Sequence, residues 1–428
     1  MEFSRPRGTR DFLPDDMERR RVVEARMRSA FESYGYREIC TPTFEHLELF
    51  TERSGEGIKK ELYNFKDKGD RDMTLRPELT APVMRFYVSD MQRMPKPIKL
   101  YYFGNCFRYE EPQSGRYREF WQFGCELLGT DNPEGEAEVI GLAMNAISAA
   151  GSKNSDLHIS HLGVLRKMFA DGGVPHEKQR VLMRLIDKMD KVGEEAVRVE
   201  LEKYGEGFAC KVLDLVALSG GAETLDRAEA LSGAKDAVSK LRQIAKYLEA
   251  CGVNPTFDFS VARGLDYYTG MVFEIYNSAL GAENQVCGGG TYALAELFGG
   301  QPVSSTGFAI GFDRILVALE KEKALPAPQR GCVFVIPVDE RRIAKAMEVV
   351  AKLRAAGIKA DVDLMRRGLK SLKYADAVGA SKALIIGDEI EQGKITVKDM
   401  KTGEQAQADE DKVVEFVSGA SGKQEEYI

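Results

Sequence analysis

The sequence predicts an α+β protein in which an antiparallel sheet is interrupted by a helical segment and followed by a small α/β domain. Three observations support this fold class. Residues 101–127 hold two aromatic-rich apolar runs joined by a short polar loop, which is typical of a hairpin. Residues 165–248 keep a helical period and are rich in Lys, Glu and Ala. Beyond the Pro- and Gly-rich linker at 325–331, strand and helix patterns alternate.

The hairpin at 101–127 places polar residues on one face, because side chains in a strand alternate between faces. The residues that share this face are Gly104, Cys106, Arg108 and Glu110 on the first strand and Phe120, Gln122, Gly124 and Glu126 on the second. The other faces carry Phe103, Phe107, Phe123 and Leu127, which suit a core. Glycine inside a strand is unfavourable unless a ligand or another backbone comes close. The polar face is therefore predicted to be the floor of a site for a small charged ligand, which the basic loop 116–118 can cover.

The N-terminal third of the chain predicts alternating short elements. A helix is expected over 15–35, because two acidic residues follow Pro14 and apolar residues recur at helical spacing. Short strands are expected at 37–44 and 73–78, with Pro42 indicating an edge or a bulge. Helices are expected at 82–91 and 134–149, and a strand at 156–160.

Strand patterns return after the helical segment. Residues 257–277 resemble a second hairpin, the glycines at 288–290 indicate a close backbone approach, and 307–319 begin as a strand and continue as a helix. The last domain is expected to run strand 333–337, helix 343–356, strand 360–363, helix 369–378, and strands 383–386 and 394–399.

Composition limits the possible functions. The chain has 428 residues, enough for two or three domains, and a formal charge of −7 that argues against a general polyanion binder. No apolar run approaches the roughly 20 residues that span a bilayer, and no secretory signal is seen, so no membrane partner is expected. Seven cysteines without a CxxC pair and four scattered histidines indicate a reducing cytoplasm and no metal site.

The common nucleotide-binding loops are absent from this sequence. It contains neither GxxxxGK[ST] nor a GxGxxG between a strand and a helix, so a bound ATP would need another means of recognition. Arginine is the natural candidate, because its guanidinium meets phosphate oxygens bidentately and keeps its charge. Arg108, Arg263 and Arg314 stand in strand-like or strand-edge settings. For each arginine taken alone, a structural salt bridge to a nearby carboxylate is the alternative to a phosphate contact. Taken together, the glycines around the three arginines favour a phosphate-binding site.

Several motifs together resemble the class II aminoacyl-tRNA synthetases. FRYE at 107–110, with the following RYREF, resembles motif 2. GFAIGFDRIL at 307–316 resembles motif 3, and residues 15–44 resemble motif 1, which forms the dimer in that class. TLRPELTAP at 74–82, ARGLDYYTG at 262–270, RGTRDFLP at 7–14 and QFGCELLG at 122–129 are similar to signatures of the histidyl-tRNA synthetase family. The resemblance covers nearly the whole chain in the same order.

The resemblance implies a homodimer that binds ATP with Mg²⁺, joins it to L-histidine as histidyl-adenylate, and passes the histidyl group to histidine tRNA. Arg108 and Arg263 would be the catalytic cations on either side of the reacting phosphate. The implied ATP contacts are Arg108, Glu110, Arg116, Phe120 and Arg314. The implied histidine contacts are Glu78, Leu79, Thr80, Arg108, Gln122, Glu126, Arg263, Tyr267, Tyr268 and Tyr292. Core packing is the alternative role for Tyr267 and Tyr268.

The chain departs from the family pattern at three positions. Thr291 and Ala293 flank Tyr292 where Arg and Asp are usual, so the polar support of that tyrosine is missing. In the motif 2 loop, Glu111 replaces a residue that is commonly basic, which puts the contact to the tRNA acceptor end in doubt, although Gln113 is available for it.

The resemblance divides the chain into a catalytic core at 1–164 and 253–325, a helical insertion at 165–252 and an anticodon-binding domain at 331–421. Arg366, Arg367 and Lys370, with Lys373 and Lys382, form a basic cluster that predicts a tRNA surface; a solvated helix face is the alternative.

The main competing function is a catalytically inactive, synthetase-like regulatory subunit of histidine biosynthesis. The retained arginines and C-terminal domain argue against it. RGLDYYTG and QFGCE argue against a proline, threonine or glycine enzyme, and the absence of HRD and DFG motifs argues against a kinase.

Overall fold

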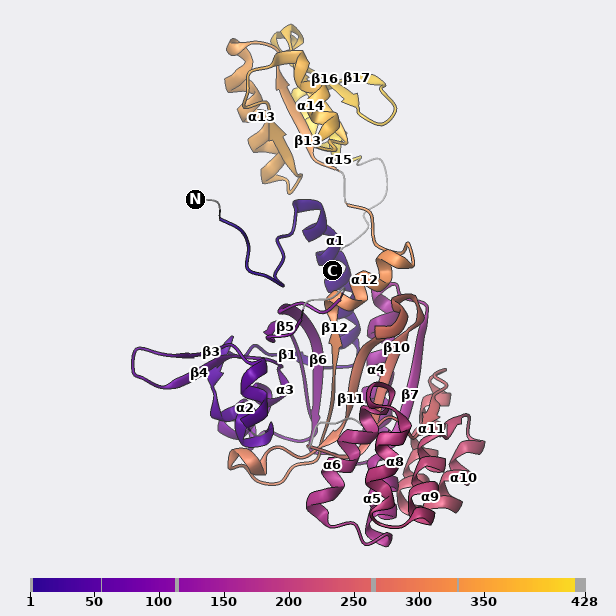
Figure 1. Cartoon of the computed structure of the whole chain (residues 1–428). Helices are drawn as coiled ribbons and strands as arrows, with labels where there is room; N and C mark the ends of the chain where they lie inside the picture. Colours follow the sequence, from indigo (N-terminus) through magenta and orange to yellow (C-terminus); the bar gives the residue numbers. More distant parts are fainter. Residues whose placement is uncertain (1–2, 55, 112–114, 263–266, 329–330, 420–428) are drawn as a thin grey trace. The chain divides into compact units, whose positions relative to one another are not determined.

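The computed structural model describes residues 3–54, 56–111, 115–262, 267–328 and 331–419. The chain divides into two compact units, Met1–Pro326 and Ala327–Ile428. We refer to them as the first and second units and describe each by itself (Figure 1).

A nine-stranded sheet forms the centre of the first unit, with the strand order β1-β5-β6-β12-β11-β10-β7-β9-β8. Neighbours are antiparallel except for the β1–β5 and β7–β9 pairs. The strands are β1 Arg37–Glu38, β5 Ile98–Phe107, β6 Glu119–Leu128, β7 Ser155–His161, β8 Ser219–Gly220, β9 Thr256–Asp258, β10 Tyr268–Asn277, β11 Gln285–Tyr292 and β12 Ser305–Gly311. The expected antiparallel core and the β5–β6 hairpin are therefore confirmed.

Helices α1 (Pro14–Ser33) and α4 (Pro133–Ala150) lie on one face of this sheet. Helix α1 begins with a proline and two acidic residues in its first turn, which suits the positive end of a helix dipole. Its Phe31 ring stacks on Tyr101 and Phe123, with ring centroids 5.2 and 5.5 Å apart. Because these rings belong to the odd-numbered face of the hairpin, the even-numbered face is left to the site.

A small sheet of order β2-β4-β3 lies beside the large one (Figure 1). Its strands are β2 Phe44–His46, β3 Asn64–Lys66 and β4 Asp72–Leu75, and the neighbouring helices are α2 Glu48–Ser54, η1 Glu56–Glu61, α3 Thr80–Phe86 and η2 Tyr87–Met91. The single strand expected at 37–44 is wrong: β1 and β2 belong to different sheets, and Pro42 lies between them. A proline donates no backbone hydrogen bond, so it interrupts a ladder at this point.

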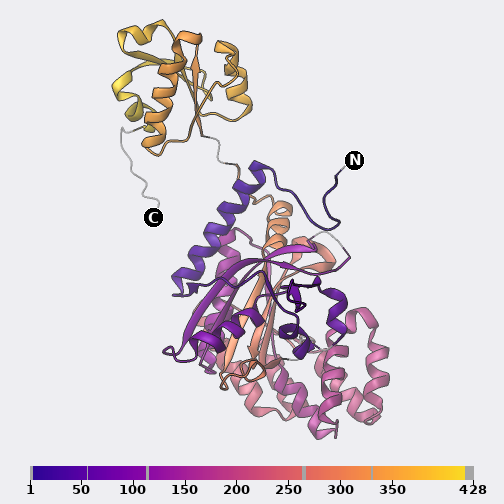
Figure 2. The same cartoon turned by 90° about the vertical axis from the view of Figure 1, so that its left-hand side faces the viewer.

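Seven helices follow β7 and group together beside β7 and β10 in both views (Figures 1 and 2). They are α5 Leu162–Asp171, α6 His176–Asp187, α7 Met189–Val192, α8 Glu194–Glu202, α9 Glu206–Val216, α10 Glu223–Ser232 and α11 Lys235–Ala250. They share the hydrophobic core of the first unit, and α11 packs on α4.

The hairpin expected at 257–277 is wrong. Strands β9 and β10 do not pair with each other, because β7 lies between them, antiparallel to β10 and parallel to β9. The first unit ends with η3 Ser278–Glu283, β11, η4 Glu296–Phe298, β12 and the helix α12 Phe312–Lys321, so the strand-to-helix change expected at 307–319 is confirmed.

The second unit contains a five-stranded sheet of order β14-β13-β15-β16-β17. Its elements are β13 Val333–Pro337, η5 Glu340–Arg342, α13 Ile343–Ala355, β14 Ala360–Val362, η6 Gly368–Lys370, α14 Ser371–Ala377, β15 Lys382–Ile386, η7 Asp388–Gln392, β16 Lys394–Asp399, β17 Gln405–Asp409, η8 Glu410–Lys412 and α15 Val413–Ser418. The predicted α/β alternation is confirmed, and β17 and α15 continue it beyond the predicted elements.

The strands β10, β11 and β12 approach each other so closely that glycine is needed between them. A Cβ on Gly289 would lie 2.4 Å from the backbone oxygen of Gly307 and 2.6 Å from Cβ of Phe308. One on Gly290 would lie 2.5 Å from the backbone oxygen of Met271. The close approach expected at 288–290 is confirmed at these two positions.

We expect Gly289→Ala to destabilise the first unit by about 1–3 kcal/mol, because the methyl group overpacks a buried strand pair. Gly207→Ala in α9 is the control, since a Cβ there meets nothing within 4 Å and alanine favours a helix by about 0.8–1.0 kcal/mol. Urea unfolding of both variants measures the difference. Equal urea midpoints for Gly289→Ala and Gly207→Ala would contradict the close approach of the strands at Gly289.

Candidate functional site

The polar face of the hairpin forms the floor of a cavity of about 400 Å³ in the first unit. Of the residues proposed for histidine, those that line it are Glu78, Thr80, Arg108, Gln122, Glu126, Tyr267, Tyr268 and Tyr292. Of those proposed for ATP, Arg108, Glu110, Arg116, Phe120 and Arg314 all line it. The structure therefore gathers in one cavity side chains that are up to 236 positions apart, from Glu78 to Arg314.

Leu79 is the described residue of the proposed histidine site whose side chain lies elsewhere. Leu79 is buried in the hydrophobic core at 2% exposure, so its side chain does not line the cavity. Arg263 and Gln113 lie outside the described residues.

Glu126 lies at the bottom of the cavity with only 1% of its surface exposed. Its Oε1 accepts a hydrogen bond from the Tyr102 hydroxyl (3.2 Å) and its Oε2 one from the Tyr292 hydroxyl (2.6 Å). Burial raises the pKa of Glu126 to about 8, and the nearby Glu78 carboxylate adds to the rise, while hydroxyl hydrogen bonds oppose it. A carboxyl group in this state is neutral near pH 7 and is available to a polar ligand.

Two glycines make room for this carboxyl group and its partner. A Cβ on Gly307 would lie 1.9 Å from Oε2 of Glu126, and a Cβ on Gly124 would lie 2.4 Å from the Tyr102 hydroxyl. The sequence predicted a ligand or another backbone near Gly124, and this is confirmed: a Cβ there would also lie 2.5 Å from the backbone oxygen of Phe308 on β12. Tyr102 was missed, although its even number already placed it on the polar face.

The segment 76–81 forms the adjoining wall, and its Glu78 caps a helix. The Glu78 carboxylate accepts hydrogen bonds from the backbone N–H groups of Thr80 (2.7 Å) and Ala81 (3.1 Å) at the start of α3. These bonds satisfy donors that a helix N-terminus leaves unpaired. Glu78 therefore holds the wall as well as lining it.

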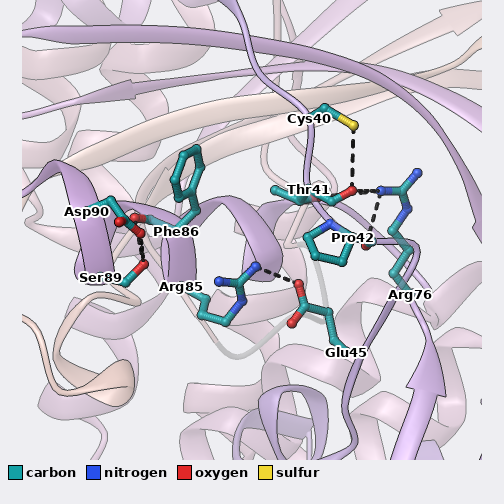
Figure 3. Close-up of polar contacts among 9 residues, drawn as sticks. All are labelled: Cys40, Thr41, Pro42, Glu45, Arg76, Arg85, Phe86, Ser89 and Asp90. Carbon is teal, nitrogen blue, oxygen red and sulfur yellow. Dashed lines mark hydrogen bonds and ion pairs between the residues drawn. The ribbon is translucent and has the colours of Figure 1, made fainter.

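Arg76 fixes this wall to the rest of the first unit (Figure 3). It is 5% exposed, and its Nη1 donates to the backbone oxygens of Thr41 (2.7 Å) and Pro42 (3.3 Å). Its Nε donates to the backbone oxygen of Asn105 on β5 (2.8 Å). In the same region Arg85 binds Glu45 of β2 at 2.8 Å. Arg76 was not among the predicted site residues; a charge inside TLRPELTAP was the only signal for it.

Arg108 follows directly after β5 and faces the cavity. Its Nε donates to the backbone oxygen of Pro77 (2.9 Å), its guanidinium lies 5.2 Å from the centre of the Phe120 ring, and its Nη1 is 3.9 Å from Glu110 Oε1. The Nε bond fixes the plane of the guanidinium, so the Nη groups are presented in a set orientation.

The start of α12 supplies a second cation, Arg314, which donates to the backbone oxygen of Gln285. The preceding Asp313 is 2% exposed and binds Arg10 (2.7 Å) and Arg20 (2.8 Å), and it accepts from the backbone N–H of Trp121 (2.7 Å). The Arg10 guanidinium also lies 3.4 Å from the centre of the Tyr117 ring. The N-terminal segment is thereby fixed to Tyr117, which lines the cavity.

Tyrosine rings form the remaining wall. The rings of Tyr267 and Tyr268 lie 4.5 Å apart between centroids, and Tyr267 meets Tyr292 edge-on at 5.8 Å. All three are less than 9% exposed and line the cavity. They thus pack in the core and face the cavity at once, so the two roles weighed for them are compatible.

In the second unit, Arg366, Arg367 and Lys370 are exposed and follow the end of β14. Arg366 is ion-paired with Glu340, and the Arg367 guanidinium lies 4.8 Å from the centre of the exposed Tyr374 ring. Lys382 begins β15, in register with Val333, which pairs with Ala360 at the start of β14. It therefore does not extend the cluster at the end of β14.

Among the described residues, no group of three or more His, Cys, Asp and Glu side chains is arranged to hold a metal ion. In the same part of the chain, no helix has the length and apolarity to cross a bilayer.

The sequence profile described as "Histidyl-tRNA synthetase" matches residues 8–315, and that described as "Anticodon binding domain" matches 332–419. Histidine–tRNA ligase of Archaeoglobus fulgidus is 47% identical over 407 residues, covering 95% of this chain and 97% of that protein.

Two solved structures are also similar over nearly the whole chain. Apo histidyl-tRNA synthetase of S. aureus has a TM-score of 0.73 at 32% identity and covers 97% of this chain and 100% of its own. Histidyl-tRNA synthetase from Nostoc sp. PCC 7120 has a TM-score of 0.82 at 25% identity and covers 98% and 99%.

The antiparallel sheet, its motif 2 hairpin and the second unit are those of a class II aminoacyl-tRNA synthetase with an anticodon-binding domain. Within that class, the chain belongs to the histidyl-tRNA synthetase family.

We expect Glu126→Gln to gain stability relative to the unsubstituted chain as pH rises from about 5 to about 8. The folded pKa of Glu126, about 8, lies above its ordinary value of 4.5, so the folded state binds more protons in this window. The free energy of unfolding therefore falls with pH, and glutamine removes that loss. Urea unfolding at both pH values, without ligands, measures the difference. If the free energies of unfolding of Glu126→Gln and the unsubstituted chain differ by the same amount at both pH values, the raised pKa is contradicted.

Proposed function

We propose that the cavity of the first unit binds L-histidine and ATP side by side and joins them as histidyl-adenylate. The chain is a histidine–tRNA ligase by family, so its activity is the ATP-dependent attachment of histidine to tRNA. The observation that supports the cavity as its site is the meeting of a buried, hydrogen-bonded Glu126 at one end with arginines at the other.

At the histidine end, Glu126 and Gln122 are proposed to hydrogen-bond the amino acid, with Glu78 and Thr80 beside them and Tyr267, Tyr268 and Tyr292 around the imidazole. Leu79 would act here through its backbone, because its side chain is in the core. A site that pairs buried polar groups with its ligand rejects analogues that lack those groups, since the groups are then left unpaired.

At the ATP end, Phe120 is proposed to stack on the adenine, and Glu110, Arg116 and Arg314 to bind its edge and the outer phosphates. ATP would enter with Mg²⁺ as part of the substrate, and the metal would be held chiefly by phosphate oxygens.

The histidine carboxylate attacks the α-phosphate, pyrophosphate leaves, and the 3′ end of the tRNA then takes the histidyl group and releases AMP. Arg108 is proposed to hold the α-phosphate and the carboxylate together, because its Nε is fixed on Pro77 and its Nη groups are left for these oxygens. Arg263 is proposed as the second cation. This catalysis depends on position and charge, without a protein base.

The tRNA is proposed to meet the second unit at Arg366, Arg367 and Lys370, and the motif 2 loop at Gln113. The proposed domains are the catalytic core at 1–164 and 253–325, the helical insertion at 165–252 and the anticodon-binding domain at 331–421. We further propose that the enzyme is a cytoplasmic homodimer. The exposed Phe44 and Phe65 pair on the small sheet, with ring centroids 6.4 Å apart, is one apolar surface available for it.

The competing function, a catalytically inactive regulatory subunit, is not favoured. The profile of the anticodon-binding domain matches the second unit, and the relative from Archaeoglobus fulgidus, a histidine–tRNA ligase, covers 95% of the chain.

The test of the proposed function is ATP–pyrophosphate exchange by the purified chain with each of the twenty amino acids. We expect exchange with histidine alone, because a polar pocket closed by Glu126 and tyrosines suits imidazole. Exchange with another amino acid would overturn the pocket assignment. No exchange at all, from folded protein, would instead favour the regulatory subunit.

We expect the double substitution Arg367→Met and Lys370→Met to raise the KM for histidine tRNA without changing ATP–pyrophosphate exchange. Loss of two phosphate contacts would also make tRNA binding less dependent on salt. The slope of the logarithm of the binding constant against the logarithm of the salt concentration would fall by roughly one per contact. Lys401→Met is the control, because Lys401 is exposed in the turn after β16, away from the cluster. Equal tRNA binding in both variants would remove the cluster from the tRNA surface.

A further inference from the structure

A cation of the helical segment holds the strand that carries two of the tyrosines. Arg166, in α5, donates Nη1 to the backbone oxygen of Thr269 (2.6 Å) and Nη2 to that of Tyr268 (2.7 Å). Tyr268 and Thr269 are the first residues of β10, next to Tyr267. One side chain therefore binds two successive carbonyl groups immediately beside the proposed histidine pocket.

The sheet leaves this position open for Arg166. The β7–β10 ladder begins at the pair of His161 with Met271, and β7 ends at His161. The chain then turns into α5, which carries Arg166 five residues later. Strand β7 thus does not reach the carbonyl groups of Tyr268 and Thr269, and Arg166 satisfies them in its place. Tyr268 is buried, whereas Thr269 is exposed. Loss of the Arg166 side chain would remove one donor from each of two successive carbonyl groups, at a greater cost for Tyr268, and would loosen the start of β10.

A second cation of the same segment supports the neighbouring strand. Lys240, in α11, lies with Nζ 3.1 Å from Oε1 of Glu136 in α4. Glu136 is 1% exposed and accepts a hydrogen bond from the hydroxyl of Thr291 on β11, which also lies 3.1 Å from the Thr306 hydroxyl. Burial raises the pKa of Glu136, and Lys240 opposes the rise. Glu136 thus links α11, through the partly exposed Lys240, to β11, through the Thr291 hydroxyl.

The contact from Lys240 through Glu136 reaches Thr291, which is one residue away from the pocket-lining Tyr292. Thr291 precedes Tyr292, whose hydroxyl donates to Glu126 at 2.6 Å. Thr291 also stands where the family pattern usually has an arginine. Here Thr291 binds the carboxyl group of Glu136, which Lys240 of α11 also contacts, so the helical segment contributes to the polar support of β11.

We propose that Arg166 and Lys240 are positioning residues, through which the helical segment sets the shape of the histidine-side wall and thereby the affinity for histidine. The inference rests on the proposed function of the cavity and names the residues that keep its tyrosines in place. Neither cation lines the cavity. Their effect is therefore expected on histidine, whose wall they hold, and not on ATP, for which the proposed contacts Arg108 and Arg314 are oriented by the backbone oxygens of Pro77 and Gln285.

The experiment compares the full-length chain with Arg166→Met in ATP–pyrophosphate exchange, varying histidine and ATP in turn. We expect the KM for histidine to rise about tenfold, since a small misplacement of binding groups is costly, while the KM for ATP changes less than about twofold. Arg166→Lys keeps the charge but cannot make both hydrogen bonds in the same geometry. Its KM for histidine is expected to lie between those of the unsubstituted chain and Arg166→Met.

Lys167→Met is the matched control. Lys167 is the next residue of α5, is 47% exposed and pairs only with Asp171 of its own helix among the ion pairs described. We expect it to leave both KM values unchanged. Lys240→Met tests the second contact in the same way, and a rise in the KM for histidine alone is expected there too.

An unchanged KM for histidine in folded Arg166→Met would overturn the proposal, as would an equal rise in both KM values, because that indicates general loosening. If Arg166→Met does not fold, the same comparison of KM values in Arg166→Lys and Lys240→Met decides it. Lack of histidine-dependent exchange in the unsubstituted chain would reject the proposed function instead, so the two failures are distinguishable.

Discussion

The structure of the site depends on one buried carboxyl group. Glu126 is buried on β6, an interior strand of the nine-stranded sheet, and a carboxylate there is unfavourable unless it is neutralised or hydrogen-bonded. Its two oxygens take hydroxyl groups from β5 and β11, on opposite sides of β6. Gly307 on β12 gives it room. Four strands, β5, β6, β11 and β12, therefore contribute to the surroundings of this one side chain. The pocket forms only because the strand order brings them together.

The cationic end of the cavity is organised differently. Arg108 and Arg314 donate to the backbone oxygens of Pro77 and Gln285, which orient the two guanidinium groups, and Arg108 Nη1 also lies 3.9 Å from Glu110 Oε1. By contrast, Asp313, in the first turn of α12, is bound by both Arg10 and Arg20. Backbone carbonyl groups thus orient arginines that line the cavity, whereas a buried carboxylate anchors two arginines of the N-terminal part of the chain.

The parts of the site that were predicted depend on local regularity. Alternation along the hairpin was enough to place Gln122 and Glu126 on one face, because a strand has a fixed period of two. The same rule does not tell which distant strand lies beside which. Strand β7 enters between β9 and β10 although about a hundred residues separate it from them, so the hairpin expected at 257–277 failed. Arg76 was missed for a related reason, because its partners Thr41, Pro42 and Asn105 are set by tertiary contacts that no local pattern encodes. Tyr102 is different: alternation placed it on the polar face, but its partner Glu126 lies on the neighbouring strand.

The two ends of the cavity suit a reaction between an amino acid and a phosphate. In the proposed reaction, Glu126 and the tyrosine hydroxyls would bind the side chain of the amino acid. The arginines oriented by Pro77 and Gln285 would stabilise the charge that builds on the phosphate oxygens as pyrophosphate leaves. Glu126 is itself held by hydroxyl groups from two strands. Both ends of the cavity are therefore shaped by contacts within the protein before a ligand enters, which lowers the cost of ordering the site when the ligands bind.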